Sequence, residues 1–444
     1  MGTARSVSAR GLTRRKFLGT TGLALASLSF GGALLDACGG LKLSIGTLPN
    51  GALTDDQLLE TIELAAFQFF WNQASPATGL VKDRAVWQGT DASSVSSIAA
   101  TGFGLTALCV ADSRGYLPTA QLKQRALAAL SFLSAQAPVE NGFFYHFMDM
   151  NTGARAGTSE VSSIDTAILL CGILACRAHF QDPQITSLAN EIYQRINWQW
   201  MLDGGTTLSM GWTPESGFLP ARWDTYSELM MLYLLAIGAP ANAIPASSWD
   251  AWSRPTLTYQ GLTYITGNAP LFIHQYSHAW IDFRNQHDAY ADYFQNSVTA
   301  TQAHKLFCLS LVGQFPDYKD NFWGITLSDS VKGYVAWGGP PAMGPIDGSL
   351  VPCATAGSMP FLPADTLAVQ QNLYENFGST AWTPYGFVDA FNPLTHWVDA
   401  YVLGIDLGIG MLMAENYRTQ FVWNTFMQNP EITAAMMQVG FQPG

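Results

Sequence analysis

Three acidic residues lie at or near the start of strongly apolar segments of the chain. Glu228 precedes a run from Leu229 to Ile237, Asp165 precedes Thr-Ala-Ile-Leu-Leu, and Asp406 follows Gly-Ile. A carboxylate in apolar surroundings is costly unless it is hydrogen-bonded or used in chemistry. Two carboxyl groups across a cavity can hydrolyse a sugar acetal, one as the acid and one to activate water. We therefore expect Glu228 as general acid, Asp406 as base or water-positioning group, and Asp165 as a third functional acid.

Each acid also has a structural interpretation, which the sequence leaves open. A carboxylate in the first turn of a helix interacts favourably with the helix macrodipole, by less than about 1 kcal/mol when it is exposed. Ser162 or Ser163 could cap the helix that contains Asp165, and Thr225 or Ser227 could cap the one that contains Glu228. In this interpretation the acids stabilise helices and take no part in turnover.

The pair His274 and His278 has the i, i+4 spacing that places two ligands on one helix face. Gln275 stands where zinc peptidases carry a general-base glutamate, and a third ligand is not evident. Polar contacts to sugar, or hydrogen bonds that support the site, explain the pair better than a metal. We expect no metal and no cofactor.

The hydrophobic pattern predicts an all-α protein, because most segments repeat with helical periodicity. Roughly a dozen helices with long aromatic loops between alternate pairs fit a toroid of paired helices. A Gly- and Pro-rich stretch at 314–362 reads as a long functional loop. The expected helices are 55–71, 95–111, 117–136, 161–180, 183–200, 223–238, 276–289, 291–313, 364–377 and 397–428, with an extended segment at 142–147.

Composition narrows the classes of partner. The net charge is −12, so nucleic acid is excluded as a partner, since phosphate binding needs a basic surface. An aromatic content of 12%, with 14 Trp, suits a large core and an aromatic cleft for carbohydrate. Beyond Cys38, the cysteines at 109, 171, 176, 308 and 353 are odd in number and mostly apolar in context, which predicts buried free thiols.

The first 37 residues resemble an export signal. Thr-Arg-Arg-Lys-Phe-Leu at 13–18 is a twin-arginine motif, and the apolar stretch at 23–35 is too short and too rich in small residues for a stable membrane span. It ends in Leu-Asp-Ala-Cys38, which resembles a lipoprotein cleavage box. We expect a signal peptide at 1–37, lipidation at Cys38, a linker at 38–52 and one catalytic domain at 53–444, located in the periplasm or at the cell surface.

Several longer motifs resemble those of the bacterial glycoamylase-like family, which includes endo-β-1,2-glucanases. The resemblance covers the chain from about residue 55 onward. It implies an (α/α)6 barrel and inverting hydrolysis of β-1,2-glucan, with the important acids at Asp165, Glu228, Asp406 and, with less support, Glu160. Leu407 replaces a polar neighbour that the family usually has after its aspartate. The motifs lie at 97–104, 142–147, 163–167, 272–284, 323–325 with 328–329, 336–341, 385–393 and 413–418.

A sugar-binding cleft needs polar contacts and stacking faces. Glu160 and Asp165 would bind sugar hydroxyls or tune the acid. The other expected polar contacts are Arg84, His274, His278 and Asp389, and the expected aromatic contacts are Tyr276, Trp323, Trp337, Tyr385 and Trp397. The expected partner is an oligo- or polysaccharide. The alternatives are a non-catalytic glycan-binding surface lipoprotein, and a hydrolase or transferase acting on another glucan linkage.

Overall fold

The computed structural model describes residues 53–338 and 341–444. The expected signal peptide, Cys38 and the linker to residue 52 lie outside the described residues. The helices are α1 (Asp55–Asn72), α2 (Ile98–Arg114), α3 (Thr119–Ala135), α4 (Ser163–Phe180), α5 (Pro183–Arg195), α6 (Trp198–Met201), α7 (Met230–Ile237), α8 (Tyr293–Ser310), α9 (Pro352–Ala356), α10 (Pro363–Ala381), α11 (Gly404–Thr419), α12 (Phe421–Phe426) and α13 (Pro430–Gln438). Three short 3₁₀ segments accompany them: η1 (Ala246–Trp249), η2 (Leu271–His274) and η3 (Tyr276–Ala279).

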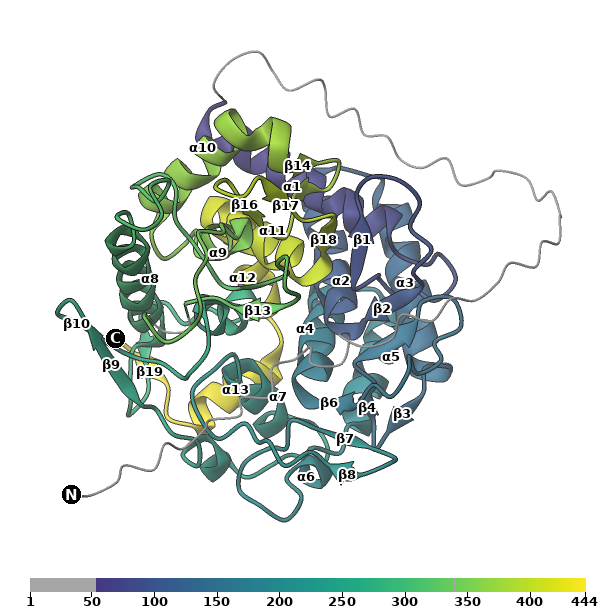
Figure 1. Cartoon of the computed structure of the whole chain (residues 1–444). Helices are drawn as coiled ribbons and strands as arrows, with labels where there is room; N and C mark the ends of the chain where they lie inside the picture. The colour runs from purple at the N-terminus through teal and green to yellow at the C-terminus, as the bar shows by residue number, and fades with distance from the viewer. Residues whose placement is uncertain (1–52, 339–340) are drawn as a thin grey trace, which may run out of the picture. The chain divides into compact units, whose positions relative to one another are not determined.

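Outer and inner helices alternate along the chain. The inner segments are α2, α4, α7, η2 with η3, α9 and α11, and they pack against one another, with α2 between α4 and α11. The helices α1, α3, α5, α8 and α10 lie outside them, as Figure 1 shows for α3 and α5 beside α2 and α4. This alternation is the predicted all-α (α/α)6 architecture.

The inner segments are apolar because they have no solvent-facing side. All eight residues of α7 are buried, as are the first fourteen of α4. The helix α4 is long and apolar enough to span a membrane, but 78% of that window is buried inside the protein, as expected for a core helix. The cysteines at 109, 171, 176, 308 and 353 are free and buried, which confirms the prediction of buried thiols.

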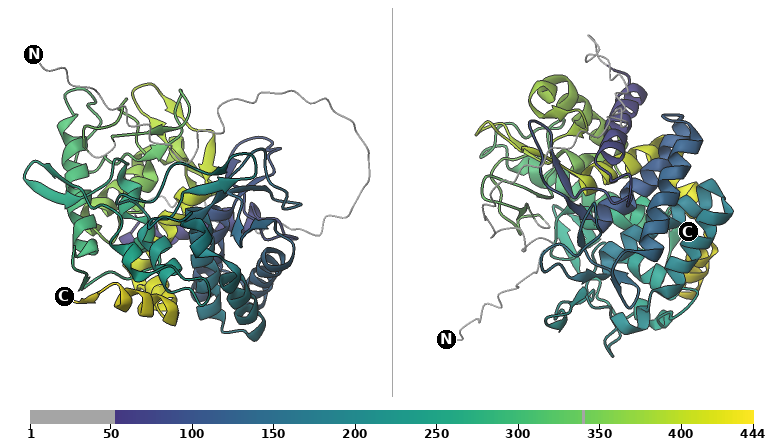
Figure 2. Two further views of the ribbon diagram at one scale, coloured as in Figure 1. Left: turned by 90° about the horizontal axis from the view of Figure 1, so that it is seen from below. Right: turned by 90° about the vertical axis from the view of Figure 1, so that its right-hand side faces the viewer.

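The right view of Figure 2 shows blue helices from the N-terminal part of the chain lying side by side. Short antiparallel strands, paired in two- and three-stranded sheets, connect the helices. They are β1 (Arg84–Val86), β2 (Val95–Ser97), β3 (Val139–Glu140), β4 (Phe143–Phe144), β5 (Phe147–Asp149), β6 (Val161–Ser162), β7 (Gly211–Thr213), β8 (Gly217–Phe218), β9 (Thr256–Tyr259), β10 (Leu262–Ile265), β11 (Gln286–His287), β12 (Leu327–Ser328), β13 (Val335–Ala336), β14 (Trp382–Thr383), β15 (Gly386–Phe387), β16 (Phe391–Asn392), β17 (Trp397–Val398), β18 (Tyr401–Leu403) and β19 (Gln442–Pro443).

Several expected helix boundaries are wrong, for local reasons. The segment 223–238 is helical only from Met230, and neither Thr225 nor Ser227 caps it. Residues 276–289 form the single turn η3 and no α-helix. The expected helix 397–428 begins as β17 and β18, which pair with β16 and β1, and it is interrupted at Gln420, whose φ of 63° is left-handed. The stretch 314–362 is not only a loop, because it contains the inner helix α9.

Candidate active site

The starts of neighbouring inner helices are joined by backbone hydrogen bonds. The first amide of α11, at Gly404, donates to the carbonyl of Asp83 (2.8 Å), and the amide of Asp83 donates to Val95 at the start of β2 (3.1 Å). The amide of Ile98, the first residue of α2, donates to the carbonyl of His146 (3.1 Å). The side chains that follow each start therefore lie at the same end of the helices.

One group of side chains centres on His146. Its Nδ1 lies 2.9 Å from Oε1 of Glu160, and its Nε2 lies 3.6 Å from Oδ2 of Asp165. The amide of His146 donates to the carbonyl of Glu160, which fixes the pair in register (2.8 Å). Asp165 is 2% exposed, in the first turn of α4, whereas Glu160 is partly exposed. The two predicted acids thus lie on either side of one histidine.

Glu228 lies in the turn that precedes α7 and is 3% exposed. Its carbonyl accepts a hydrogen bond from the hydroxyl of Ser277 (2.8 Å), which in turn accepts from the amide of Met231 (3.1 Å). The same segment is tied to α4 because the indole of Trp223 donates to Ser163 (2.9 Å). The start of α7 is therefore held against α4 and η3, at the end that also carries Asp165.

Asp406 is half-buried in the first turn of α11 and lines a small cavity of about 30 Å³ with Asp389 and Cys353. Burial raises the pKa of Asp389 well above its usual value, and the neighbouring charge of Asp406 raises it further. Burial and the two acids also raise the pKa of the Cys353 thiol. Glu228 does not line this cavity, so the prediction that Glu228 and Asp406 act as a pair across one cleft stays a prediction.

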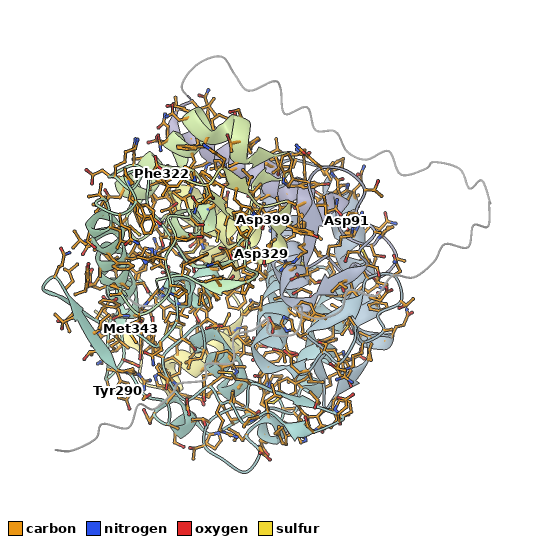
Figure 3. The ribbon with its side chains drawn as sticks, in the orientation of Figure 1. Asp91, Tyr290, Phe322, Asp329, Met343 and Asp399 are labelled. Carbon is orange, nitrogen blue, oxygen red and sulfur yellow. The ribbon has the colours of Figure 1, made fainter. Side chains whose placement is uncertain are left out.

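A second group of acids adjoins Asp406. Carboxylate oxygens of Asp329, Asp389 and Asp399 lie within 4.8 Å of one another, and Figure 3 shows Asp329 and Asp399 close together near the middle of the view. Burial, followed by the charge of Asp329, raises the pKa of Asp399 to about 7. Arg84 supplies positive charge through ion pairs to Asp329 and Asp83.

Comparison with known proteins agrees with this architecture. Residues 220–430 match the Glycoamylase family, which is described as "Putative glucoamylase". The chain is 27% identical over 426 residues to an exo-β-1,2-glucooligosaccharide sophorohydrolase (non-reducing end) of Parabacteroides distasonis, covering 87% of this chain and 58% of that protein. The resemblance to glycoamylase-like proteins is confirmed.

Solved structures extend the likeness to these proteins. An endo-β-1,2-glucanase of Chitinophaga pinensis superposes with a TM-score of 0.80 at 28% identity, over 88% of this chain and 99% of that chain. A β-1,2-glucanase of Parabacteroides distasonis gives a TM-score of 0.79 at 26% identity, over 87% of this chain and 60% of that chain. The chain spans about 58% of the length of the curated relative it matches.

The two histidines predicted to contact sugar lie in the core of the protein, at 3% and 1% exposure for His274 and His278. Nδ1 of His274 pairs with the hydroxyl of Tyr226 (3.2 Å), and Nε2 of His278 pairs with Ser297 (3.1 Å). Burial lowers the pKa of each histidine to about 3, so both rings are neutral. Their shared helix face was also wrongly predicted, because η2 and η3 are separate turns. The expected role in sugar contact is not supported, since protein groups surround both rings.

Three of the predicted stacking residues are also buried. Trp323 is 0% exposed, Tyr276 is 3% exposed against Phe103 and Phe272, and Trp337 is 5% exposed. They pack the ends of the helices and offer no open ring face, because the apolar segments around them need bulky side chains.

Tyr385 and Trp397 keep partly exposed side chains and remain candidates for stacking on sugar. The hydroxyl of Tyr385 accepts a hydrogen bond from Gln73 (2.7 Å). Trp397 lies on β17, opposite Asn392 of β16.

Sequence reasoning did not assign roles to His146, Asp329, Asp399 or Cys353. His146 and Asp329 lie in motifs that carry the family resemblance, so a signal was available for both. Asp399 follows Trp397-Val398 with no local pattern, and only the pairing of β16 with β17 brings it to Asp389.

Proposed function

We propose that this protein is an exported glycoside hydrolase that cleaves β-1,2-glucan by an inverting acid/base mechanism. The observation that carries the proposal is the placement of Asp165, Glu228 and Asp406 at the starts of three inner helices of an (α/α)6 fold. Proteins named β-1,2-glucanase or β-1,2-glucooligosaccharide sophorohydrolase share this fold at 26–28% identity.

In this mechanism Glu228 protonates the glycosidic oxygen and Asp406 directs a water molecule to the other face of the ring. Inverting enzymes leave room for that water by holding the two carboxyl groups roughly 6.5–9.5 Å apart. Glu160 and Asp165, which lie on either side of His146, would bind sugar hydroxyls or tune the acid.

The relatives differ in where they cut. One is named as an exo-acting enzyme that works from the non-reducing end, and another as an endo-acting glucanase. Product size therefore distinguishes endo from exo cleavage. A ladder of oligosaccharides indicates internal cleavage, and release of one disaccharide indicates exo cleavage.

A panel of purified β-1,2-, β-1,3-, β-1,4- and α-1,4-glucans tests the proposed function. We expect products from the β-1,2-glucan alone, and a rate about 10²–10⁴-fold lower when Glu228→Gln replaces the wild-type protein. Activity on another linkage would replace the proposed substrate. Binding of β-1,2-glucan without any product would favour the non-catalytic glycan-binding alternative.

Export is part of the proposal and rests on the sequence alone. The twin-arginine motif at 13–18 and Cys38 would place the protein in the periplasm or at the cell surface, attached by a lipid. We expect the wild-type protein in the membrane fraction and Cys38→Ser in the soluble fraction. A wild-type protein that is already fully soluble outside the cytoplasm would exclude the lipid anchor, and retention in the cytoplasm would exclude export.

A further inference from the structure

The acids beside Asp406 are incompletely neutralised by protein groups. Asp389 accepts a hydrogen bond at Oδ2 from the amide of Asp329 (2.7 Å), and Asp399 accepts one at Oδ1 from the amide of Tyr401 (3.2 Å). Within the described part of the chain, Oδ1 of Asp389 and Oδ2 of Asp399 have no hydrogen-bond partner. Both residues are almost fully buried, at 3% and 5% exposure.

An unpartnered buried carboxylate oxygen is expensive, because burial removes its hydration and nothing replaces it. Repulsion adds to this cost, since Asp329, Asp389 and Asp399 lie within 4.8 Å of one another and Asp389 also adjoins Asp406. Arg84 is the cation that pairs with this group, and it is also shared with Asp83. The remaining negative charge calls for a further cation or for bound protons.

The spacing of the oxygens fits a metal ion. The carboxylate oxygens of Asp329, Asp389 and Asp399 lie within 4.8 Å of one another. Oxygens bound to one Ca²⁺ at about 2.3–2.6 Å can lie up to about 5.2 Å apart, so one ion reaches all three. Carboxylates without a nitrogen or sulfur ligand favour a hard cation, which excludes zinc and copper as the preferred ions.

We propose that Asp329, Asp389 and Asp399 form a binding site for a hard divalent cation of the size of Ca²⁺. The site joins three connections of the chain: the segment after β12, the segment between β15 and β16, and the turn between β17 and β18. Since Asp389 also adjoins Asp406, the cation would fix the acids around the proposed base without contacting the His274 and His278 pair. This inference departs from the expectation, drawn from the sequence, that the protein has no metal.

The acidic group around His146 differs from the proposed cation site in its hydrogen bonds. Glu160 pairs with Nδ1 of His146, and Asp165 accepts from the hydroxyl of Ser162 (2.6 Å). Each acid there already has a protein partner, so that group needs no ion. The unpartnered oxygens occur at Asp389 and Asp399.

Titration of CaCl₂ into the chelator-treated full chain tests the proposal, by calorimetry and by thermal unfolding without any glucan. We expect saturable binding of one Ca²⁺ per chain and a melting temperature that rises with its concentration. MgCl₂ should bind more weakly, because Mg²⁺ requires a tighter octahedral site. The absence of glucan separates this result from the outcome of the proposed function.

Two substitutions and one control locate the ion. Asp399→Asn and Asp329→Asn should each weaken Ca²⁺ binding by at least about tenfold. Asp91→Asn is the control: Asp91 pairs with Lys82 at 2.9 Å, apart from the cluster, and this variant should bind as the wild type does. Undiminished Ca²⁺ binding by both cluster variants would overturn the proposal. It would also be overturned by a joint result, in which the wild type binds no Ca²⁺ and the Asp399→Asn variant melts at a higher temperature than the wild type. The last result would mean that the acids hold protons in place of an ion.

Discussion

The hydroxyl of Ser162 donates a 2.6 Å hydrogen bond to Oδ2 of Asp165 and accepts one from the amide of the same residue at 3.3 Å. The two residues thus form a reciprocal cap at the start of α4. The structural interpretation of Asp165 is therefore partly correct. His146 approaches the same oxygen at 3.6 Å, which keeps Asp165 within the candidate site as well.

Substitution of the two cap residues separates these roles. Ser162→Ala removes the cap and should lower the free energy of unfolding by about 1 kcal/mol, with near-normal turnover. Asp165→Asn keeps the shape and can still accept from Ser162, so it should lower turnover more than stability. Paired urea unfolding and rate measurements check this. Equal losses of stability with unchanged turnover in both variants would make Asp165 a cap only.

Near-isosteric substitutions should separate the catalytic roles of the proposed acid and base from their contributions to stability. Glu228→Gln and Asp406→Asn should each lower turnover by about 10²–10⁴-fold, since general acid–base catalysis typically contributes that much. Removal of one charge beside Asp389 relieves repulsion, so the stability of Asp406→Asn should not fall.

The matched control is Asp224→Asn, because Asp224 is an exposed acid four positions before Glu228. Its turnover and melting temperature should equal those of the wild type. If Glu228→Gln instead melts lower and turns over normally, Glu228 is a structural acid.

The buried histidines predict a pH dependence of stability. The pKa of His274 is lowered from 6.5 to about 3, so below pH 6.5 the unfolded chain binds a proton that the folded chain does not. The free energy of unfolding should therefore fall as pH falls from 6.5 towards 3, by up to about 1.4 kcal/mol per pH unit for this residue. His274→Asn should show a shallower slope in urea unfolding between pH 4.5 and 7. Identical slopes would contradict the neutral, buried state.

Ion pairs at the C-terminal ends of α2 and α11, away from the candidate site, should affect the free energy of unfolding and leave turnover unchanged. Arg418 contacts the fully buried Glu63 at 2.6 Å, and Arg114 contacts the buried Glu415 at 2.6 Å. Arg418→Met leaves Glu63 without its nearest cation and should cost about 3–5 kcal/mol of unfolding free energy. Glu60→Gln is the control: its carboxylate also pairs with Arg418, at 2.8 Å, but is 38% exposed, so its loss should cost less than about 1 kcal/mol. Similar losses in both variants would contradict this account.

Periodicity predicted the long helices because their burial depends on local pattern. The predicted helix 55–71 corresponds to α1, and the predicted segments at 117–136 and 183–200 contain α3 and α5. The start of α7 could not be predicted, because it depends on contacts with distant segments: Ser277 bonds to the carbonyl of Glu228, and Trp223 bonds to Ser163. Residues 401–403 form a strand for a similar reason, because their partner β1 is more than 300 positions away, whereas residues 397–398 pair with the nearby β16.

The same distinction holds for the candidate site. An acidic residue at the start of an apolar run is unusual, and this local pattern allowed Asp165, Glu228 and Asp406 to be predicted from the sequence. Asp329 reaches the site through a hydrogen bond from its amide to Asp389, 60 positions further along the chain, and Asp399 reaches it through the hairpin of β16 and β17. Residue type and spacing alone do not reveal either contact. The burial of Trp323 and His278 could not be read from residue type, since aromatic rings and histidines serve both cores and clefts.

Time-resolved proton NMR of β-1,2-glucan hydrolysis tests the central claim most directly, because one spectrum reports both the cleavage and the anomer that forms first. An inverting attack on a β-linkage releases the α anomer, which later equilibrates in water. We predict new reducing ends whose first-formed anomer is α, formed about 10²–10⁴-fold more slowly by Glu228→Gln. No new reducing ends, or a first-formed β anomer, would contradict the account in which Glu228 and Asp406 act as acid and base.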